Sequence, residues 1–283
     1  MKSLKIIECP RDAMQGIIEF IPTSKKVEYI NALLKCGFDT LDFGSFVSPK
    51  AIPQMQDTAI VLEQLNPSET KLLAIIANER GAVNACDFEQ IKYLGFPFSI
   101  SEEFQKRNTN ATIESSFLEV EKIQNLSTKS DKKLVLYLSM GFGNPYGENW
   151  NIDLLYKWCN DLHSKLGIEI LALSDTIGAA TPELVKSTLL DLIPALPTSE
   201  IGVHLHTISS NAKSLVAAAF EAGCRRFDGA IKGFGGCPMA MDQLTGNMPT
   251  EVMIEWFREN NIETGIHPLE FNDSYNLSAK IFN

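Results

Sequence analysis

The strongest chemical signal in the sequence is a pair of histidines separated by one residue, His204 and His206. On a β-strand, residues i and i+2 point to the same side, so the two imidazoles would stand next to each other. Neutral imidazole is the commonest protein ligand for metals, and two neighbouring rings can bind one ion. Two strand-end histidines held by ordinary hydrogen bonds would give the same pattern, so the pair alone leaves both interpretations open.

An arginine–aspartate dipeptide, Arg11-Asp12, follows an apolar run at 4–9. Such a dipeptide is more commonly a surface ion pair, which contributes little to stability. At the end of a strand, however, Asp12 could complete the histidine site, and Asn247 could add an amide oxygen. A mixed set of nitrogen and oxygen ligands suits Mg2+, Mn2+, Fe2+ or Zn2+. Arg11 could stabilise a developing enolate oxygen, because its guanidinium is always charged.

Two glycine-rich segments could carry function. The segment GFGGCP at 233–238 contains Cys237, and a thiol near a metal can act as a general acid or base. A buried turn cysteine is the more common alternative. The segment GFGNPYG at 141–147 lacks the patterns of nucleotide-binding loops. We interpret it as a substrate-covering loop, with a plain turn as the alternative.

These residues must be positioned by regular elements, and the sequence alternates short apolar runs with longer amphipathic stretches. The runs expected to be strands are 4–9, 40–44, 71–76, 96–100, 133–139, 168–174, 200–206 and 225–230. The stretches expected to be helices are 24–36, 50–65, 79–93, 112–129, 151–166, 182–192, 209–223 and 249–260. Such alternation predicts a parallel sheet, and its spacing favours a (β/α)8 TIM barrel over an open doubly wound sheet. In a barrel, the polar residues that follow the strands gather on one face.

The domain organisation expected from length is simple. The chain has 283 residues, which is long for an average domain but ordinary for a TIM barrel. We therefore expect a single TIM-barrel catalytic domain over 1–283. Residues 261–283 are expected to be a C-terminal extension, either a last helix on the barrel or part of an oligomer contact.

Composition excludes several classes of partner. The net charge of −10 argues against a nucleic-acid binder, which needs a basic face. The six cysteines are scattered without a CxxC pair, which favours a reducing, cytoplasmic location. The first residues do not read as a signal peptide, and no apolar run approaches the length of a membrane span, so no membrane association is expected.

Taken together, the motifs resemble the 3-hydroxy-3-methylglutaryl-CoA lyases of the DRE-TIM metallolyase superfamily. The segments that carry the resemblance are ECPRDAMQ (8–15), SFVSPKAIPQMQD (45–57), LSDTIGAATP (173–182), HLH (204–206) and GFGGCP with downstream TGN and TE (233–251). They occur in the same order in the chain, from about residue 4 to 265. SFVSPK with QM, and GxGGCP, are the segments more specific to the lyase branch.

The resemblance implies roles for individual residues. The positions that match the metal ligands are Asp12, His204, His206 and Asn247. The implied ion is Mg2+ or Mn2+, with Zn2+ as an alternative. Arg11 matches the arginine that steadies the enolate, and the base that removes the hydroxyl proton is expected to be Asp12 or metal-bound solvent. Cys237 matches a loop cysteine of proton transfer, with a relay through His204 as the other route.

The resemblance also implies a substrate shell. The positions that match substrate-binding residues are Gln15, Asp42, Asp175 and Lys50, with Asn108 beside Lys50 on the path of coenzyme A. The implied reaction cleaves 3-hydroxy-3-methylglutaryl-CoA to acetyl-CoA and acetoacetate by a retro-Claisen step. The implied partner is an acyl-CoA, and a homodimer is one expected assembly.

Two alternatives stay open at this point. One is a Claisen-condensing acyltransferase of the same superfamily, although the short segment after the barrel disfavours it. The other is a non-catalytic barrel that binds an acyl-CoA or a metal, which the retained Arg11, Asp12 and Cys237 disfavour.

The chain also departs from the family pattern at three positions. Thr207 stands where an acidic residue is usual, Asp42 replaces a glutamate, and Asn144 replaces a cysteine. The metal ligands survive these changes, but the acyl-binding shell is expected to differ. We therefore expect cleavage of a 3-hydroxyacyl-CoA whose preferred acyl group can depart from that of the family.

Overall fold

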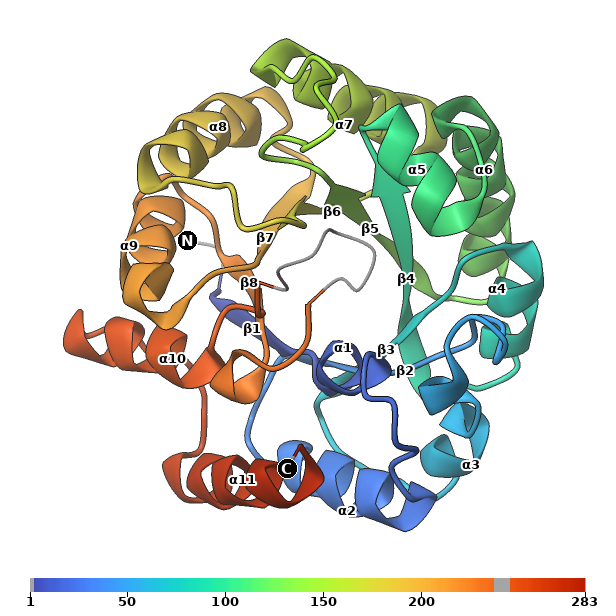
Figure 1. The fold of residues 1–283 in the computed structure, drawn as a ribbon, viewed down its shortest axis with the longest axis vertical. Coiled ribbons are helices and arrows are strands. Elements are labelled where there is room, and N and C mark those ends of the chain that lie inside the picture. The colour runs from blue at the N-terminus through green and yellow to red at the C-terminus, as the bar shows by residue number, and fades with distance from the viewer. Residues whose placement is uncertain (1–2, 237–244, 283) are drawn as a thin grey trace.

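A computed structural model of the protein describes residues 3–236 and 245–282. Its eight strands form a closed barrel in sequence order, and every neighbouring pair is parallel (Figure 1). The strands are β1 (Lys5–Glu8), β2 (Thr40–Ser45), β3 (Lys71–Ile75), β4 (Ile91–Ser99), β5 (Lys133–Ser139), β6 (Ile170–Asp175), β7 (Glu200–Leu205) and β8 (Arg226–Gly229). The predicted (β/α)8 TIM barrel is confirmed.

The helices surround the barrel, as Figure 1 shows. They are α1 (Pro10–Gln15), α2 (Thr23–Leu33), α3 (Thr58–Leu62), α4 (Glu79–Cys86), α5 (Glu102–Thr109), α6 (Ile113–Lys129), α7 (Ile152–Leu166), α8 (Pro182–Ala195), α9 (Ser209–Glu221), α10 (Thr250–Glu259) and α11 (Pro268–Ile281). Two 3-10 helices, η1 (Pro53–Met55) and η2 (Ile231–Gly233), lie in loops. Several helices begin at a side-chain cap, such as Thr181 accepting from the N–H of Leu184 before α8.

The structure differs from the sequence prediction along 50–93. The expected helix 79–93 ends at Cys86, and β4 already begins at Ile91. Tyr93 fits the apolar face of an amphipathic helix, but in the structure it pairs in register with Leu73 of β3. Pairing with a neighbouring strand has therefore overridden the local propensity. The expected helix 50–65 is divided into η1 and α3.

The apolar core has two parts. The larger part fills the space between the barrel wall and the helices. The smaller part lies inside the barrel and comes from β3 to β6. Its members are Leu73, Ile75, Tyr93, Val135, Tyr137, Ile170 and Ala172. Because strand residues alternate between the two sides of the wall, these seven residues line one half of the barrel lumen.

The opposite half of the lumen is charged. Arg226 of β8 pairs in register with Lys5 of β1, and Asp228 of β8 pairs with His204 of β7. Both Arg226 and Asp228 are almost fully buried. β8, which lies between β7 and β1, therefore places two buried charges beside the strands that carry or precede the predicted metal ligands.

The last helix lies against the first full-length helix of the barrel. The rings of Phe38 and Phe271 are 6.2 Å apart, and those of Tyr29 and Phe282 are 5.7 Å apart. Phe38 follows α2 and Phe271 belongs to α11, so apolar edge-to-face contacts hold the C-terminal helix on the outer layer (Figure 1).

Candidate metal and substrate site

The two histidines of the predicted site lie side by side at the end of β7. Both are buried, and their ring centroids are 5.4 Å apart. Asp12 lies across from them, and one ligand atom from each of the three residues lies within 4.8 Å of the other two. The alternation of the strand has therefore placed both imidazoles on the lumen side, as the spacing predicted.

Asp12 reaches the cluster because α1 starts immediately after β1. Pro10 is the first residue of α1, a position where its fixed φ favours a helix and its missing N–H is not needed. The abrupt start turns Arg11 and Asp12 inward above the barrel, where both are buried. The strand-end position inferred from the sequence is thereby confirmed for both residues.

Asn247 is held by pairing with β7 rather than by a free loop. It forms an isolated antiparallel bridge with His206. The N–H of Thr207 donates to the carbonyl of Gly246 at 2.8 Å, and the N–H of Met248 donates to the carbonyl of Leu205 at 2.9 Å. These bonds fix the backbone of Asn247 beside the second histidine.

The side-chain amide of Asn247 is oriented by hydrogen bonds that its nitrogen donates. Its Nδ2 donates to Asp12 Oδ2 at 2.6 Å and to the carbonyl of Phe234 at 2.8 Å. Its Oδ1 is buried and has no hydrogen-bond partner within residues 3–236 and 245–282. Buried acceptors are rarely left without a partner, so this oxygen fits a ligand for a divalent cation beside the carboxylate and two imidazoles.

One glycine makes this close approach possible. A Cβ at Gly235 would lie 2.7 Å from Asn247 Nδ2 and 2.7 Å from the carbonyl oxygen of Asp12. Gly235 also has a φ of +91°, which side chains disfavour. A glycine is thus needed at position 235, where the backbone of the GFGG segment passes the cluster.

The electrostatics of the cluster suit a cation. Burial raises the pKa of Asp12, but the charge of Arg11 and the two histidines outweigh it and lower that pKa to about 2. Burial and the neighbouring His204 lower the pKa of His206 to about 4. A carboxylate and a neutral imidazole are the protonation states that a metal ligand requires.

Arg11 is held by an array of acceptors. Its Nε and Nη2 donate to Asp42 at 3.0 and 2.5 Å, and its Nη1 donates to Asp12 and to Gln15, each at 2.9 Å. Burial raises the pKa of Asp42 to about 6 against the opposing effect of Arg11. Asp42 is fully buried beneath Arg11, so it contacts the guanidinium and does not line the cavity.

A cavity of about 240 Å³ opens next to these residues. Its polar wall includes Arg11, Asp12, Gln15, His204 and His206. Its remaining wall comes from several strand ends and from α5. Those residues are Val47, Ala51, Ile52, Ile75, Ala77, Pro97, Phe104, Asn108, Thr109, Tyr137, Ser139, Ser174 and Thr176.

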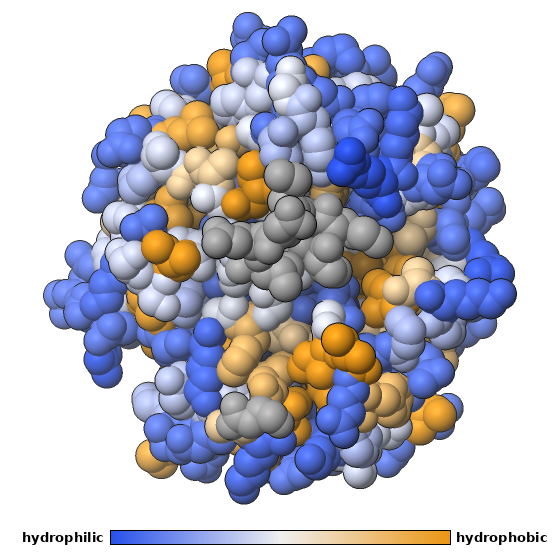
Figure 2. Space-filling view, viewed as in Figure 1, coloured by the Kyte–Doolittle hydropathy of each residue, from blue (hydrophilic) through white to orange (hydrophobic). Residues whose placement is uncertain are grey.

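The face shown in Figure 2 is mainly polar at its rim. Apolar side chains gather below its centre, over α1 and the segment that follows it, where Ile18 and Phe20 are exposed. An apolar surface therefore adjoins the segment that delivers Arg11 and Asp12.

Two residues predicted to bind substrate lie elsewhere. Asp175 accepts hydrogen bonds from the N–H groups of Ala179 and Ala180, each at 2.9 Å, and closes the loop after β6. Lys50 is exposed and is not among the residues that line the cavity. Cys237 lies outside the described residues.

The sequence prediction missed cavity-lining residues of β5 and β6. In the register of β6 and β7, Ser174 pairs with His204, whereas Asp175 pairs with Leu205. Paired residues on parallel strands point to the same side, so Ser174 and Thr176 face the lumen and Asp175 faces outward. The alternation already used for the histidines could have found this.

The other two departures from the family pattern also have a local explanation. Asn144 Oδ1 accepts from the N–H of Tyr146 at 3.0 Å and of Glu148 at 3.2 Å, which folds the 141–147 segment into a turn. The hydroxyl of Thr207 donates to the carbonyl of Ile208 at 3.1 Å. His206 is instead oriented by the carbonyl of Thr176, 3.2 Å from Nδ1.

A parallel eight-stranded barrel with a histidine–carboxylate cluster at its strand ends defines a TIM-barrel protein with a candidate metal site. The HMGL-like family model matches residues 4–277, and the chain belongs to this family. The family resemblance seen in the sequence is thereby confirmed.

Named relatives agree with this assignment. Hydroxymethylglutaryl-CoA lyase YngG of Bacillus subtilis is 31% identical over 91% of this chain and 85% of its own length. A crystal structure of the B. subtilis HMG-CoA lyase has a TM-score of 0.92 at 29% identity and covers 99% of this chain and 94% of that chain. An HMG-CoA lyase from Acinetobacter baumannii, in complex with coenzyme A and 3-methylmalate, has a TM-score of 0.91 at 28% identity, with 99% and 91% covered.

Proposed function

We propose that the protein is a metal-dependent carbon–carbon lyase that cleaves 3-hydroxy-3-methylglutaryl-CoA to acetyl-CoA and acetoacetate. The observation that carries this proposal is the cluster of Asp12, His204 and His206 beside Arg11 in one cavity. The relatives named as hydroxymethylglutaryl-CoA lyases support the substrate. The A. baumannii structure with bound coenzyme A supports an acyl-CoA ligand.

Four residues would hold the metal ion in this proposal. They are Asp12, His204, His206 and Asn247, and the last is included because its Oδ1 has no hydrogen-bond partner among the described residues. Mg2+ or Mn2+ is the expected ion, with Zn2+ as the alternative. When bound, a divalent ion supplies Lewis acidity that polarises substrate oxygens and favours loss of the tertiary hydroxyl proton.

Arg11 would stabilise the enolate of acetyl-CoA. A guanidinium has five N–H donors, and its bonds to Asp42, Asp12 and Gln15 account for four of them. Counted over the described residues, one N–H on Nη2 is left for substrate. A fixed donor carrying full charge stabilises an oxyanion without having to reorganise during the reaction.

The residue that donates a proton to the enolate is then still to be assigned. His204 has Nδ1 engaged by Asp228 at 3.4 Å, so its Nε2 is the nitrogen left for a metal. The low pKa of Asp12 favours a ligand role over that of a base. The hydroxyl proton would therefore leave to solvent, and the enolate carbon would receive a proton from Cys237, whose thiolate solvent would reprotonate. Gln15 would help to orient Asp12 through a 2.7 Å bond.

The acyl-CoA would reach the site past α5. Phe104, Asn108 and Thr109 line the cavity on that side. No helix in the part of the chain that the structure describes is long and apolar enough to span a membrane. A homodimer and a cytoplasmic location remain predictions.

The test is product formation from a small panel of 3-hydroxyacyl-CoA thioesters with Mg2+ or Mn2+ present. We expect equimolar acetyl-CoA and acetoacetate from the 3-hydroxy-3-methylglutaryl thioester, lost on chelation and restored by metal. Asp12→Asn should abolish turnover. Asp39→Asn is the matched control, because Asp39 bonds Lys71 just before β2, at the other end of the barrel.

The panel also measures the acyl preference. Preference for a different thioester would mean that the departures at Thr207, Asp42 and Asn144 alter the acyl preference. Absence of cleavage of every member, with metal bound, would contradict the proposed function and favour the condensing or non-catalytic alternative.

A further inference from the structure

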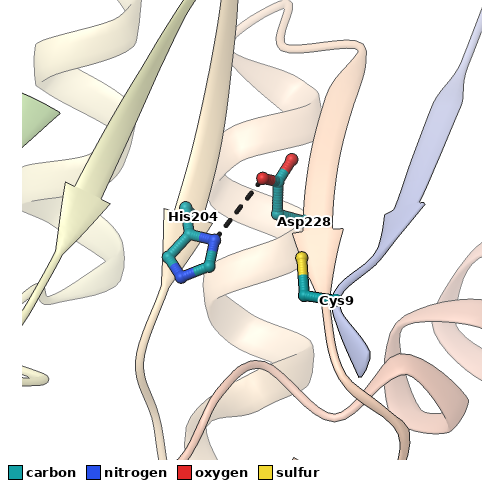
Figure 3. A group of neighbouring side chains, drawn as sticks. All are labelled: Cys9, His204 and Asp228. Atoms are coloured by element: carbon teal, nitrogen blue, oxygen red, sulfur yellow. Dashed lines mark hydrogen bonds and ion pairs between the residues drawn. The ribbon is translucent and has the colours of Figure 1, made fainter. Parts of the chain in front are cut away.

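Beneath the metal cluster, His204 has a second polar neighbour inside the barrel. Its Nδ1 lies 3.4 Å from Asp228 Oδ2, and both side chains are buried (Figure 3). They come from paired positions on β7 and β8. A neutral imidazole that donates from Nδ1 presents a lone pair at Nε2, so this contact selects which nitrogen is available to a metal.

A third potential ligand, Cys9, lies beside this pair. Ligand atoms of Cys9, His204 and Asp228 also lie within 4.8 Å of one another. A second metal site is therefore the competing interpretation of Figure 3.

The positively charged side chain of Arg226 lies beside Asp228, one of these three residues. Arg226 Nε is 3.8 Å from Asp228 Oδ1, a separation typical of an ion pair rather than of a hydrogen bond. The guanidinium is 1% exposed, and a Cβ at Gly202 would lie 2.7 Å from its Cδ, so the missing side chain at Gly202 makes room for it. A positive charge at this distance opposes a metal ion in the inner trio and complements Asp228 instead.

We propose that Asp228, backed by Arg226, is a positioning residue that fixes the Nδ1–H tautomer of His204 and directs Nε2 toward the metal cluster. The inference rests on the proposed metal site. Carboxylates that accept from the second nitrogen of a metal-binding histidine are common in proteins, and their loss weakens metal binding about 10-fold to 100-fold.

The first measurement is the affinity of the metal-free full-length protein for Mn2+, without substrate. Asp228→Asn should raise the Kd for Mn2+ about 10-fold to 100-fold, and Asp228→Glu should recover part of the loss. Glu200→Gln is the matched control, since Glu200 contacts the far side of Arg226 at 3.4 Å and should leave the Kd unchanged. An unchanged Kd for Asp228→Asn in a folded protein would overturn the proposal.

The second measurement reports the tautomer directly and does not depend on metal. The chain has four histidines, so nitrogen-15 labelling of histidine gives an assignable two-bond correlation spectrum. Wild-type His204 should show the Nδ1–H form, and Asp228→Asn should change that pattern. An Nε2–H form in the wild type would overturn the assignment.

A third variant separates positioning from an inner metal site. Cys9→Ala should keep the wild-type Kd for Mn2+ and for Zn2+. A loss as large as that of Asp228→Asn would make Cys9 a ligand and overturn the proposal. Failure of the proposed function is recognised separately, because a protein that binds Mn2+ with the expected variant pattern but cleaves no thioester retains the positioning role and loses the lyase assignment.

Discussion

Two buried arginine–aspartate pairs occupy the charged half of the barrel, and they are built differently. Arg11 at the mouth lies within hydrogen-bond distance of Asp42, and its other donors reach Asp12 and Gln15 at 2.9 Å. Arg226, deeper in the lumen, is 3.8 Å from Asp228. Its Nε and Nη2 have no hydrogen-bond partner within the described residues.

The difference separates two uses of the same residue types. A guanidinium held by four short bonds is fixed in direction, which suits a group that must meet a developing charge at one point. A guanidinium that makes a looser contact contributes charge without a fixed direction. The upper pair is therefore suited to chemistry, and the lower pair to balancing a buried carboxylate.

The largest expected effect is on folding stability, from Arg226→Met. Removal of the cation leaves Asp228 as an uncompensated buried charge, which should cost about 3–5 kcal/mol of the free energy of unfolding. Urea denaturation measures this. Arg107→Met, in an exposed i,i+4 pair with Glu103, should barely change stability. Equal stability of the Arg226→Met and wild-type proteins would mean that Asp228 does not depend on Arg226.

Arg11→Met tests the upper pair and should separate activity from stability. Loss of the charge at the enolate should lower kcat about 10²-fold to 10³-fold with the metal content nearly intact. Steady-state kinetics and metal analysis of the same preparation measure this. A variant that keeps the wild-type kcat would remove Arg11 from the mechanism and with it the contrast between the pairs.

A further comparison concerns a third buried carboxyl, Glu8, which accepts from the N–H of Ile231 and the hydroxyl of Thr250. Burial raises its pKa from 4.5 to about 8, so between those values the folded state binds more protons than the unfolded state. Stability should therefore fall as pH rises from 4.5 to 8, by up to about 1.4 kcal/mol per pH unit for one carboxyl.

Glu8→Gln should remove this component of the pH dependence. The Tm of the variant should fall less than that of the wild type between pH 5 and pH 8.5, as followed by circular dichroism. Parallel Tm curves would show that Glu8 titrates near its ordinary value.

Much of the fold and of the cluster could be predicted from periodicity. Alternation placed His204 and His206 on one side of a strand, and the eight-fold repeat of strand and helix placed Asp12 at the same end of the barrel. The length of β4 could not be predicted, because it depends on pairing with β3. The local sequence of β4 does not show which strand it will pair with or over what length.

The substrate shell was harder to predict for a similar reason. Asp175 follows the correct strand, but the register of β6 against β7 turns it away from the lumen. Asp42 faces the lumen, yet Arg11 covers it. The proximity of Arg226 to Asp228 joins two residues that a charge pattern alone does not distinguish from surface groups.

The antiparallel bridge between His206 and Asn247 has a consequence for how the site responds to change. Asn247 takes its position from backbone bonds at the end of β7, the strand that also leads to His204 and His206. A substitution that shifts this strand end would therefore move three of the four candidate ligands together and preserve their spacing.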